Sequence, residues 1–487
     1  MNRHAPPLRE GIARAPLLFL LAGLCASLGA AGRGIPAVAA LAVAPLVSLG
    51  LLLLFTEFFP PGCTVYGGGI ALLALLCALH AVPTFLLPPL PPGEPFSLKG
   101  MVILERPWGS RRALLVEGEG GRFMMKVPPS SLLREGDSLE AAGRAVPLSA
   151  RRDSSFREDL YWRARGAAGE FLPEKFSLRK STGWSMARWR RALRSRILLT
   201  LPPNLRGYLL AAILGVRDPS LAEEHRRWGS AHLLAVSGFH VGLAALGAWK
   251  LLSLRRIRRR LPFRFRLVLT SLFLWIYVLL AGAAPSALRA ALMLQLVFLG
   301  KMLGRPGNPV NGVSAAALLL LLWRPEWFWD VGWRLSVTAA LTLASVNARP
   351  SWRTVLLSSP LVWLVTYPQS ASVFGPLPVA GLGVNFAALP VFAVLYPIAL
   401  FLALPALAGL PGGIFFSAPA EGLFILWRVG ADGAARLLPW SLPWSPLPVL
   451  LGGGVFVLVL AGALYPLRGR TLAGAAVTLL AVLLILS

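Results

Sequence analysis

Long runs of apolar residues recur along most of this chain. A straight bilayer crossing needs about 20 predominantly apolar residues. Several of the later runs are shorter, so they either join their neighbours or are re-entrant. The pattern predicts a polytopic α-helical membrane protein with about ten to twelve crossings. The runs cover roughly 15–32, 35–55, 67–87, 232–253, 267–284, 286–303, 310–323, 335–347, 354–367, 379–404, 447–466 and 471–487.

Residues 95–147 follow a different pattern. The segments "SLKGMVILERP", "RRALLVEGE", "GRFMMKVP" and "GDSLEAAGRAV" contain β-formers in partial alternation, separated by Gly, Pro and Gly-Asp turns. Four or five strands in about fifty residues are typical of a small β-barrel of the OB type. We therefore expect N-terminal transmembrane helices at 1–88, an OB-like domain at 89–150, a basic amphipathic segment at 151–206 and a helical channel domain at 207–487.

The charge distribution predicts the orientation. The chain has a net charge of +27, although only 14% of its residues are charged. The loop "LRRIRRRLPFRFR" between two apolar runs is rich in arginine, as short cytoplasmic loops are. The N-terminal tail, with Arg3, Arg9 and Arg14, indicates the same side. Counting crossings from the tail and back from the loop places residues 88–231 outside the cytoplasm in both cases.

This outer segment is itself rich in arginine, which leaves two interpretations open. The stretch Arg188–Leu199 alternates basic and apolar residues as an interfacial membrane helix does. Clustered Lys and Arg also bind polyanions, and OB barrels bind single strands through a basic groove with stacking aromatics. The alternative for each barrel residue is a solvated charge, or a core position for Phe123. The candidate DNA-binding residues are Lys99, Arg106, Trp108, Arg111, Arg112, Arg122, Phe123 and Lys126.

The stretch "HLLAVSGFHVGL" from His232 to Leu243 combines apolar residues with histidine, serine and glycine. If it is one unbroken α-helix, its polar side chains share one side and its two glycines lie roughly opposite. The helix would then have a packing face and a wet face. A Ser-His hydrolase would also need an orienting acid and oxyanion donors, and the histidine spacing is not that of a zinc site. We therefore expect no catalytic residues, no metal and no cofactor.

A second polar feature lies within an apolar run, in "AAPSALRAALM". Pro285 and Ser286 are typical of a helix start, with Ser286 as the N-cap. Arg289 would then lie in the first turn, where the helix dipole disfavours a cation. A passing anion would relieve both the burial and the dipole cost, whereas snorkelling to the membrane interface is the alternative.

Several segments together resemble the ComEC family of competence proteins. "LLAAILGVRDPSLAEEHRRWGSAHLLAVSGFHVGL" is similar to the family signature, and "LLAGAAPSALRAALM" resembles its next motif. "RPEWFWDVGWRLSVTAAL", "TYPQSASVFGPLPVAGLGVNFAALPV" and "SFREDLYWRARGAAGEF" resemble further family segments. The resemblance extends from the N-terminal helices to the last apolar run.

The resemblance implies a multi-pass inner-membrane channel that carries single-stranded DNA inward during natural transformation. The OB-like domain would receive the DNA and the helical domain would form the path. An external DNA receptor, a separate nuclease and a cytoplasmic helicase are the partners it implies besides DNA and the bilayer. The expected path residues are His232, Ser237, Gly238, His240, Ser286, Arg289, Gln369 and Asn385.

Two points limit what the resemblance carries over. Many relatives continue into a metallo-β-lactamase-like domain, but no histidine follows His240 here, so we expect that domain to be lacking and this chain not to be an enzyme. A different class of function also remains: a transporter of another anionic polymer or of a lipid-linked substrate, for which a basic exterior would serve equally well.

Overall fold

The computed structural model describes residues 15–54, 63–86, 95–148, 157–179, 185–304, 308–346 and 352–442. The apolar runs expected at 447–466 and 471–487 and the N-terminal arginines lie outside these residues. The chain divides into two compact units. Unit 1 comprises Met1–Leu87, Leu292–Leu382 and Trp440–Ser487, and unit 2 comprises Pro88–Ala291 and Gly383–Pro439.

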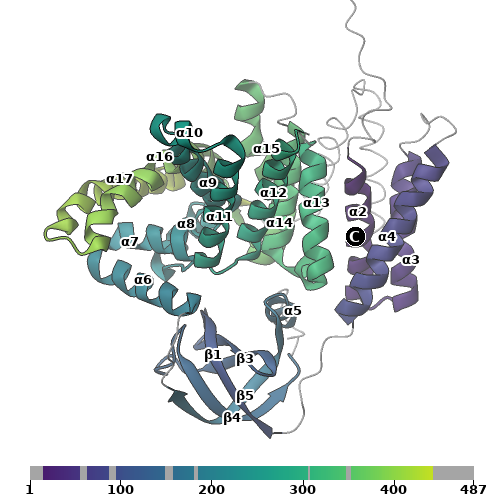
Figure 1. Ribbon diagram of the computed structural model, residues 1–487, viewed down its shortest axis with the longest axis horizontal. Helices are drawn as coiled ribbons and strands as arrows, with labels where there is room; N and C mark the ends of the chain where they lie inside the picture. The colour runs from purple at the N-terminus through teal and green to yellow at the C-terminus, as the bar shows by residue number, and fades with distance from the viewer. Residues whose placement is uncertain are drawn as a thin grey trace, which may run out of the picture. The chain divides into compact units, whose positions relative to one another are not determined.

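Unit 1 is helical. In it α2 packs against both α3 and α4, and α13 packs against α2 (Figure 1). A Cβ at Gly23 of α2 would lie only 2.6 Å from the Ala44 carbonyl oxygen of α3, so glycine permits this close approach. The elements are α2 (Pro16–Gly32), α3 (Ala37–Leu54), α4 (Cys63–Leu86), α13 (Pro309–Trp323), η3 (Pro325–Trp329), α14 (Val331–Val346), α15 (Trp352–Phe374), and the paired β6 (Leu377–Pro378) and β7 (Ser441–Leu442).

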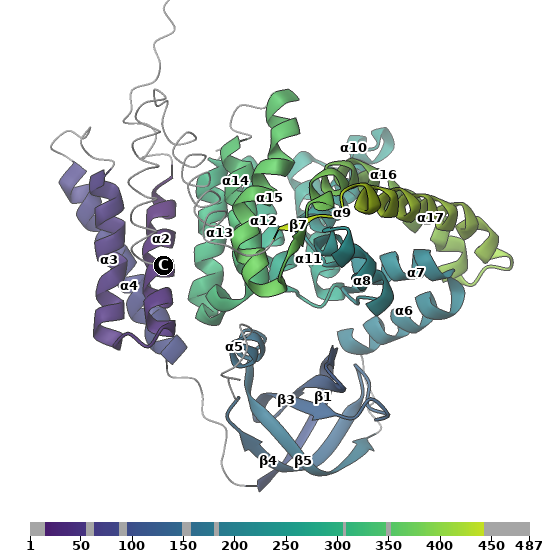
Figure 2. The same ribbon diagram turned by 180° about the vertical axis from the view of Figure 1, so that it is seen from behind.

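Unit 2 contains the predicted small β-barrel (Figure 2). Its strands close in the order β1-β2-β3-β5-β4. All its neighbouring strands are antiparallel except β3 and β5. Two-residue loops join β1 to β2 and β2 to β3, and each contains a glycine. The strands are β1 (Pro95–Trp108), β2 (Arg111–Gly118), β3 (Gly121–Val127), β4 (Ser138–Val146) and β5 (Ala167–Arg179).

The fifth strand lies beyond the expected domain border at residue 150. It follows the short helix α5 (Glu158–Arg163) and falls inside the segment expected to be basic and amphipathic. Its outer half, "LPEKFSLR", carries a proline and three charged residues, which hides the strand pattern in the sequence. The barrel core nevertheless needs it, because Phe171 is fully buried against Phe123 and Leu139.

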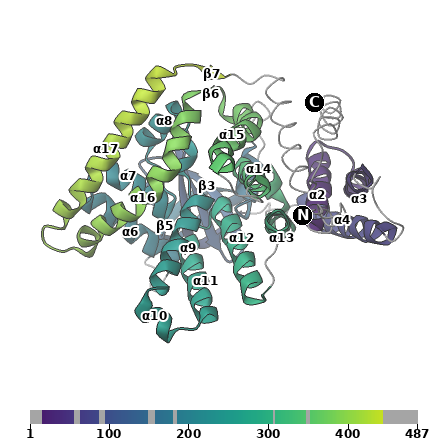
Figure 3. The same cartoon turned by 90° about the horizontal axis from the view of Figure 1, so that it is seen from above.

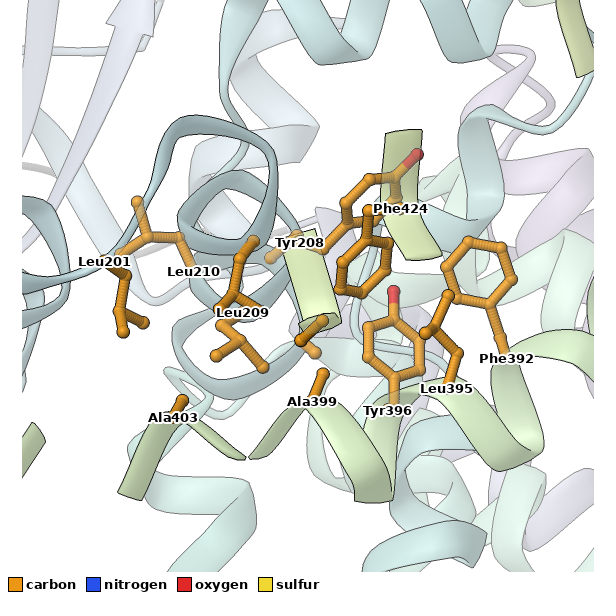
Figure 4. Close-up of a cluster of buried hydrophobic side chains, with 14 of the residues drawn as sticks. Leu201, Tyr208, Leu209, Leu210, Phe392, Leu395, Tyr396, Ala399, Ala403 and Phe424 are labelled. Carbon is orange, nitrogen blue, oxygen red and sulfur yellow. The ribbon is translucent and has the colours of Figure 1, made fainter. Parts of the chain in front are cut away.

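The helical part of unit 2 surrounds a buried aromatic cluster. Tyr208 stacks on Phe424 with ring centroids 4.2 Å apart, and Phe392 and Tyr396 pack beside them (Figure 4). α9 and α11 pack side by side and are joined by the short basic α10 (Figure 3). The helices are α6 (Met186–Thr200), α7 (Pro203–Leu209), η1 (Leu210–Leu214), α8 (Pro219–Arg227), η2 (Ala231–Leu234), α9 (Gly238–Leu252), α10 (Arg255–Arg260), α11 (Phe263–Leu280), α16 (Ala380–Ala408) and α17 (Gly413–Leu437). α12 (Pro285–Met302) runs from unit 2 into unit 1.

Four helices in the described part of the chain are long and apolar enough to cross a membrane. They are Gly69–Leu86, Phe263–Leu280, Ala380–Ala408 and Gly413–Leu437. Four shorter apolar helices, Pro16–Gly32, Ala37–Leu51, Gly238–Leu252 and Pro309–Trp323, fall below that length. This agrees with the predicted helical membrane class. α17 occupies a stretch that the apolar runs did not include.

Candidate functional site

The motif-rich segment of unit 2 begins where η1 ends. Gly215 adopts the left-handed conformation with φ +65°, which glycine accommodates without strain. The Asp218 side chain then caps α8, accepting from the backbone N–H groups of Ser220 (3.0 Å) and Leu221 (3.3 Å), and Pro219 occupies the first helical position. The Asp-Pro-Ser sequence therefore starts a helix, and its carboxylate is used for capping.

A buried histidine fastens the turn after α8. His225 is fully buried, with Nε2 2.9 Å from Tyr208 Oη and Nδ1 2.9 Å from Ser230 Oγ. Its ring also packs edge-on against Trp228, with centroids 4.7 Å apart. Burial lowers the pKa of His225 to about 4, so the ring is neutral at physiological pH. Across the described ranges, no group of three His, Cys, Asp or Glu side chains could hold a metal ion.

The prediction of one unbroken helix through His232–Leu243 is wrong. η2 ends at Leu234, the backbone is extended at Ala235, and α9 starts only at Gly238 with Ser237 as its N-cap. Serine is a favoured N-cap residue, so Ser237 starts a new helix. Side-chain directions in α9 therefore do not continue from those in η2. His232 therefore does not share a helix face with Ser237 and His240, whereas Gly238 and Gly242 both lie on α9.

Ser237 and His240 do contact each other, but as a capping pair. His240 Nδ1 lies 3.1 Å from Ser237 Oγ and 3.4 Å from the Ser237 backbone nitrogen, which donates to it. This reciprocal arrangement satisfies N–H groups at the start of α9. His240 is buried with its ring 5.0 Å from that of Tyr396, whereas His232 is exposed. The three motif histidines thus occupy three separate environments.

Most of the expected path residues lie around the segment from Gly229 to Gly238. Asn385 of α16 donates through Nδ2 to the Gly229 carbonyl oxygen at 3.2 Å, and the Ser286 hydroxyl donates to the Val236 carbonyl oxygen. A Cβ at Gly238 would meet Ala290 of α12 at 3.6 Å, an ordinary packing distance. This segment is therefore the common contact of α9, α12 and α16.

The structure changes the details predicted for Ser286 and Arg289, and it places Gln369 in the other unit. α12 begins at Pro285, so Ser286 lies within its first turn and is not the N-cap, because proline itself takes the first helical position. Arg289 is completely buried on this helix, so it does not snorkel to an exposed position. Gln369 lies in unit 1, where its Nε2 donates to Thr338 Oγ1 at 3.3 Å.

A polar face of α17 was missed in the sequence. Glu421 accepts from the backbone nitrogens of Asn204 (3.0 Å) and Leu205 (2.7 Å) at the start of α7. Arg428 donates to Asn204 Oδ1 and Glu224 Oε1, and Asp432 accepts from Trp228 Nε1 at 2.7 Å. Positions 421, 428 and 432 repeat at helical spacing within an apolar stretch, and that spacing could have identified the face.

The charged candidates in the barrel are mostly paired within the protein. Lys99 contacts Glu140 (3.2 Å), Arg122 contacts Glu117 (2.7 Å) and Lys126 contacts Glu158 (2.8 Å). Arg112 contacts Glu105 at 2.7 Å with both side chains nearly buried, and also donates to the Leu133 carbonyl oxygen. Arg111 is exposed at the start of β2. These pairs reduce the positive charge that the barrel offers to a polyanion.

The two aromatic candidates differ from expectation. Phe123 is 1% exposed in the barrel core, so a base cannot stack on it. Trp108 is only partly exposed, packs against Tyr161 and Trp162, and donates through Nε1 to Glu158 at 3.0 Å. The stacking role predicted for Phe123 is therefore wrong, since β3 turns this side chain inward.

Two arginines join the barrel to the helical part of unit 2. Arg106 of β1 donates through Nη1 to the Gly215 carbonyl oxygen at 2.9 Å. Arg190 of α6 donates to Glu135 Oε1 at 2.5 Å, to the Leu214 carbonyl oxygen at 3.1 Å and to the Leu280 carbonyl oxygen. Arg190 and Glu135 are each about 5% exposed. Arg190 lies in the basic stretch that the sequence assigned to a membrane interface or a polyanion, but it is the buried link between two parts of the unit.

Comparison with known proteins gives a consistent result. The model of the family described as "Competence protein" matches residues 213–469. ComE operon protein 3 of Bacillus subtilis is 32% identical over 146 residues, which are 29% of this chain and 18% of that protein. Recombination protein 2 of Haemophilus influenzae is 28% identical over 230 residues, which are 41% of this chain and 28% of that protein.

The matched region includes α8, η2, α9, α12, α15 and α16, and with them all eight expected path residues. The chain aligns with less than a third of the length of either curated relative. No solved structure matches this chain.

Proposed function

This chain belongs to the competence protein family, and from that membership we propose that it is an inner-membrane channel for the uptake of single-stranded DNA in natural transformation. The observation that carries the proposal is the family match over residues 213–469, which includes three of the four helices long enough to cross a membrane. The chain is thus a multi-pass membrane protein in the part that the family shares.

The proposed orientation places residues 88–231 outside the cytoplasm and α10 inside. Two features of α11 support it. Arg190, which binds the barrel, donates to the Leu280 carbonyl oxygen at the end of α11, whereas the arginine-rich α10 directly precedes the start of α11. α11 contains 18 residues and is therefore about 27 Å long, close to the hydrocarbon thickness of a bilayer.

In this proposal the barrel side receives DNA and the helical domain conducts it. The path residues of unit 2 are His232, Ser237, Gly238, His240, Ser286, Arg289 and Asn385, and Gln369 of unit 1 is proposed as a further path residue. Arg289 is completely buried on α12, so its proposed role requires this helix to open a path beside it; its guanidinium would then neutralise the charge of a passing phosphate.

The proposal assigns the remaining steps to other proteins. An external receptor would deliver duplex DNA, a separate nuclease would degrade one strand, and a cytoplasmic helicase would draw in the other. Transport of another anionic polymer or of a lipid-linked substrate is the competing function, and a basic exterior suits it equally.

Transformation frequency separates the two functions. We expect deletion of the gene to abolish transformation by linear chromosomal DNA, and a plasmid copy of this chain to restore it. Loss of an envelope polymer or lipid-linked precursor with transformation unchanged would favour the competing function. Growth rate and DNA binding at the cell surface, measured in the same strains, control for general envelope damage.

A further inference from the structure

A groove in unit 2 lies between the β3–β4 connection and α6. None of the residues that line it was among the predicted DNA-binding residues. It has a volume of about 370 Å³, within the range of about 300–1,000 Å³ typical of small-ligand pockets. We call it the α6 groove. Its lining residues include Asp137 and Ser138 on one wall and Arg188, Arg191 and Ser195 on the other.

The α6 groove is held open by contacts on both walls. Arg190, on the opposite side of α6, forms its buried ion pair with Glu135 of the β3–β4 connection. Asp137 Oδ2 accepts from the Arg134 backbone nitrogen at 2.8 Å, and the Gly136 backbone nitrogen donates to the Val102 carbonyl oxygen at 2.7 Å. A preformed site loses little conformational freedom on binding, which favours affinity.

The closest approach of the two walls is at Gly136. A Cβ there would lie 3.0 Å from both the backbone nitrogen and Cγ of Arg188, and the glycine has φ +90°. Glycine at this position therefore lets the aliphatic part of Arg188 lie directly against the β3–β4 connection. This contact fixes the base of the guanidinium side chain at one edge of the α6 groove.

The charge of the α6 groove favours an anion. α6 contains five arginines and no acidic residue. The acidic residue in the lining, Asp137, forms an ion pair with Arg191 Nη1, but the Arg191 side chain is still 44% exposed and carries five N–H donors. Because the Arg191 guanidinium is partly exposed, a phosphate can share its N–H donors with Asp137. The hydroxyls of Ser138 and Ser195 add further donors.

An exposed aromatic residue lies beside the groove. Trp189 is 59% exposed, and it precedes Ala192, a groove-lining residue, by three positions on α6. Residues three apart are neighbours on a helix surface, so the indole ring flanks the groove. A basic groove flanked by an exposed aromatic is the arrangement by which proteins bind single strands without sequence preference.

We propose that the α6 groove binds the phosphodiester backbone of single-stranded DNA, with Arg188 and Arg191 as phosphate ligands and Trp189 as a base-stacking platform. This rests on the proposed function and adds a receiving site to it. A lipid surface is the competing partner for α6, but a flat bilayer cannot enter a concave groove. Most charged barrel candidates are paired within the protein, and α6 adds five arginines without an acidic residue of its own, so we place the receiving surface beside the barrel.

The test uses the full chain in nanodiscs of neutral lipid and a fluorescent oligothymidylate, followed by anisotropy at several salt concentrations. Replacing both arginines (Arg188→Gln, Arg191→Gln) removes two phosphate contacts. It should weaken binding about tenfold or more and make the slope of log K against log salt about 1.4 less negative. Trp189→Ala should weaken binding between about fivefold and a hundredfold with the slope unchanged.

Arg144→Gln is the matched control, because Arg144 is an exposed arginine of β4 outside the α6 groove. It should bind like the unmodified chain. If the double variant is less stable in a thermal melt, Arg191→Gln alone, at an exposed side chain, replaces it in the binding measurement. This single variant should make the slope of log K against log salt about 0.7 less negative.

The groove assignment is overturned if both groove variants bind within twofold of the unmodified chain with the same slope. It is also overturned if they lose only binding to anionic vesicles, which would identify a lipid surface. If these variants bind normally while transformation still depends on the chain, the channel proposal survives and the groove does not. If the unmodified chain binds no oligonucleotide at low salt, the groove assignment fails, and transformation frequency decides the channel proposal independently.

Discussion

At the scale of single residues, unit 2 places its arginines in very different environments. Arg190 and Arg289 are buried, whereas Arg226 forms an exposed pair with Glu223 at 3.0 Å. The clustering of the arginines is visible in the sequence, and the sequence also predicted that Arg289 lies in an apolar helix. It could not predict that Arg190 is buried, because its partners, Glu135 and the Leu280 carbonyl, are distant in the chain.

Removing the Arg190 side chain should strongly destabilise unit 2. Arg190→Ala leaves Glu135 buried without its cation and removes a donor from two helix-end carbonyls, and breaking such a buried pair costs about 3–5 kcal/mol. The measurement is the free energy of unfolding in detergent. Arg226→Ala, at a pair that is mostly solvent-exposed, should change it by no more than about 1 kcal/mol. Equal effects of the two substitutions would refute the linking role.

Acid should also weaken unit 2 through His225. Its folded-state pKa of about 4 lies below the ordinary value of 6.5, so the unfolded state binds more protons between these two values. The free energy of unfolding should therefore fall as the pH decreases from about 6.5 towards 4, by up to about 3 kcal/mol from this group. His225→Gln should give a shallower pH dependence than the unmodified chain. An unchanged pH profile in His225→Gln would contradict a buried neutral ring.

At the scale of elements, the long apolar helices and the strand-rich segment were predictable because their periodicity is local. The break between η2 and α9 was not predicted, since apolar character continues across it and only Ser237 indicates a new helix start. β5 was missed because its second half carries charged residues, and because α5 separates it from its partners β3 and β4. Non-local strand pairing is the information that a single sequence reveals least.

The capping role of Ser237 predicts a moderate loss of stability on substitution. Ser237→Ala removes the hydroxyl that lies 3.1 Å from His240 Nδ1 at the start of α9, and the loss of an N-cap typically costs about 1 kcal/mol. A thermal melt of the purified chain measures this. Ser195→Ala, on the exposed side of α6, should change stability by less than about 0.5 kcal/mol. A Ser237→Ala chain as stable as the original would exclude the cap.

At the scale of the whole molecule, the proposed orientation separates the barrel from α10 by one membrane thickness. In a chain with Cys25, Cys63 and Cys77 replaced by serine, a new cysteine at Ser110 of the β1–β2 turn should react with a membrane-impermeant thiol reagent in spheroplasts. A cysteine at Arg258 of α10 should react only after the membrane is permeabilised. Labelling of both positions, or of Arg258→Cys alone, in sealed spheroplasts would overturn the orientation.

The central claim is that this chain conducts DNA across the membrane and does not merely bind it. The most direct measurement follows labelled DNA in cells that lack the gene, separating nuclease-sensitive label outside from nuclease-resistant label inside. The account predicts that cells without the chain keep the outside label and lose the inside label. It also predicts that the chain restores the inside label and that Arg289→Gln does not, while Arg264→Gln, at an exposed arginine of α11, does. Nuclease-resistant label that persists inside cells without the chain would contradict the account.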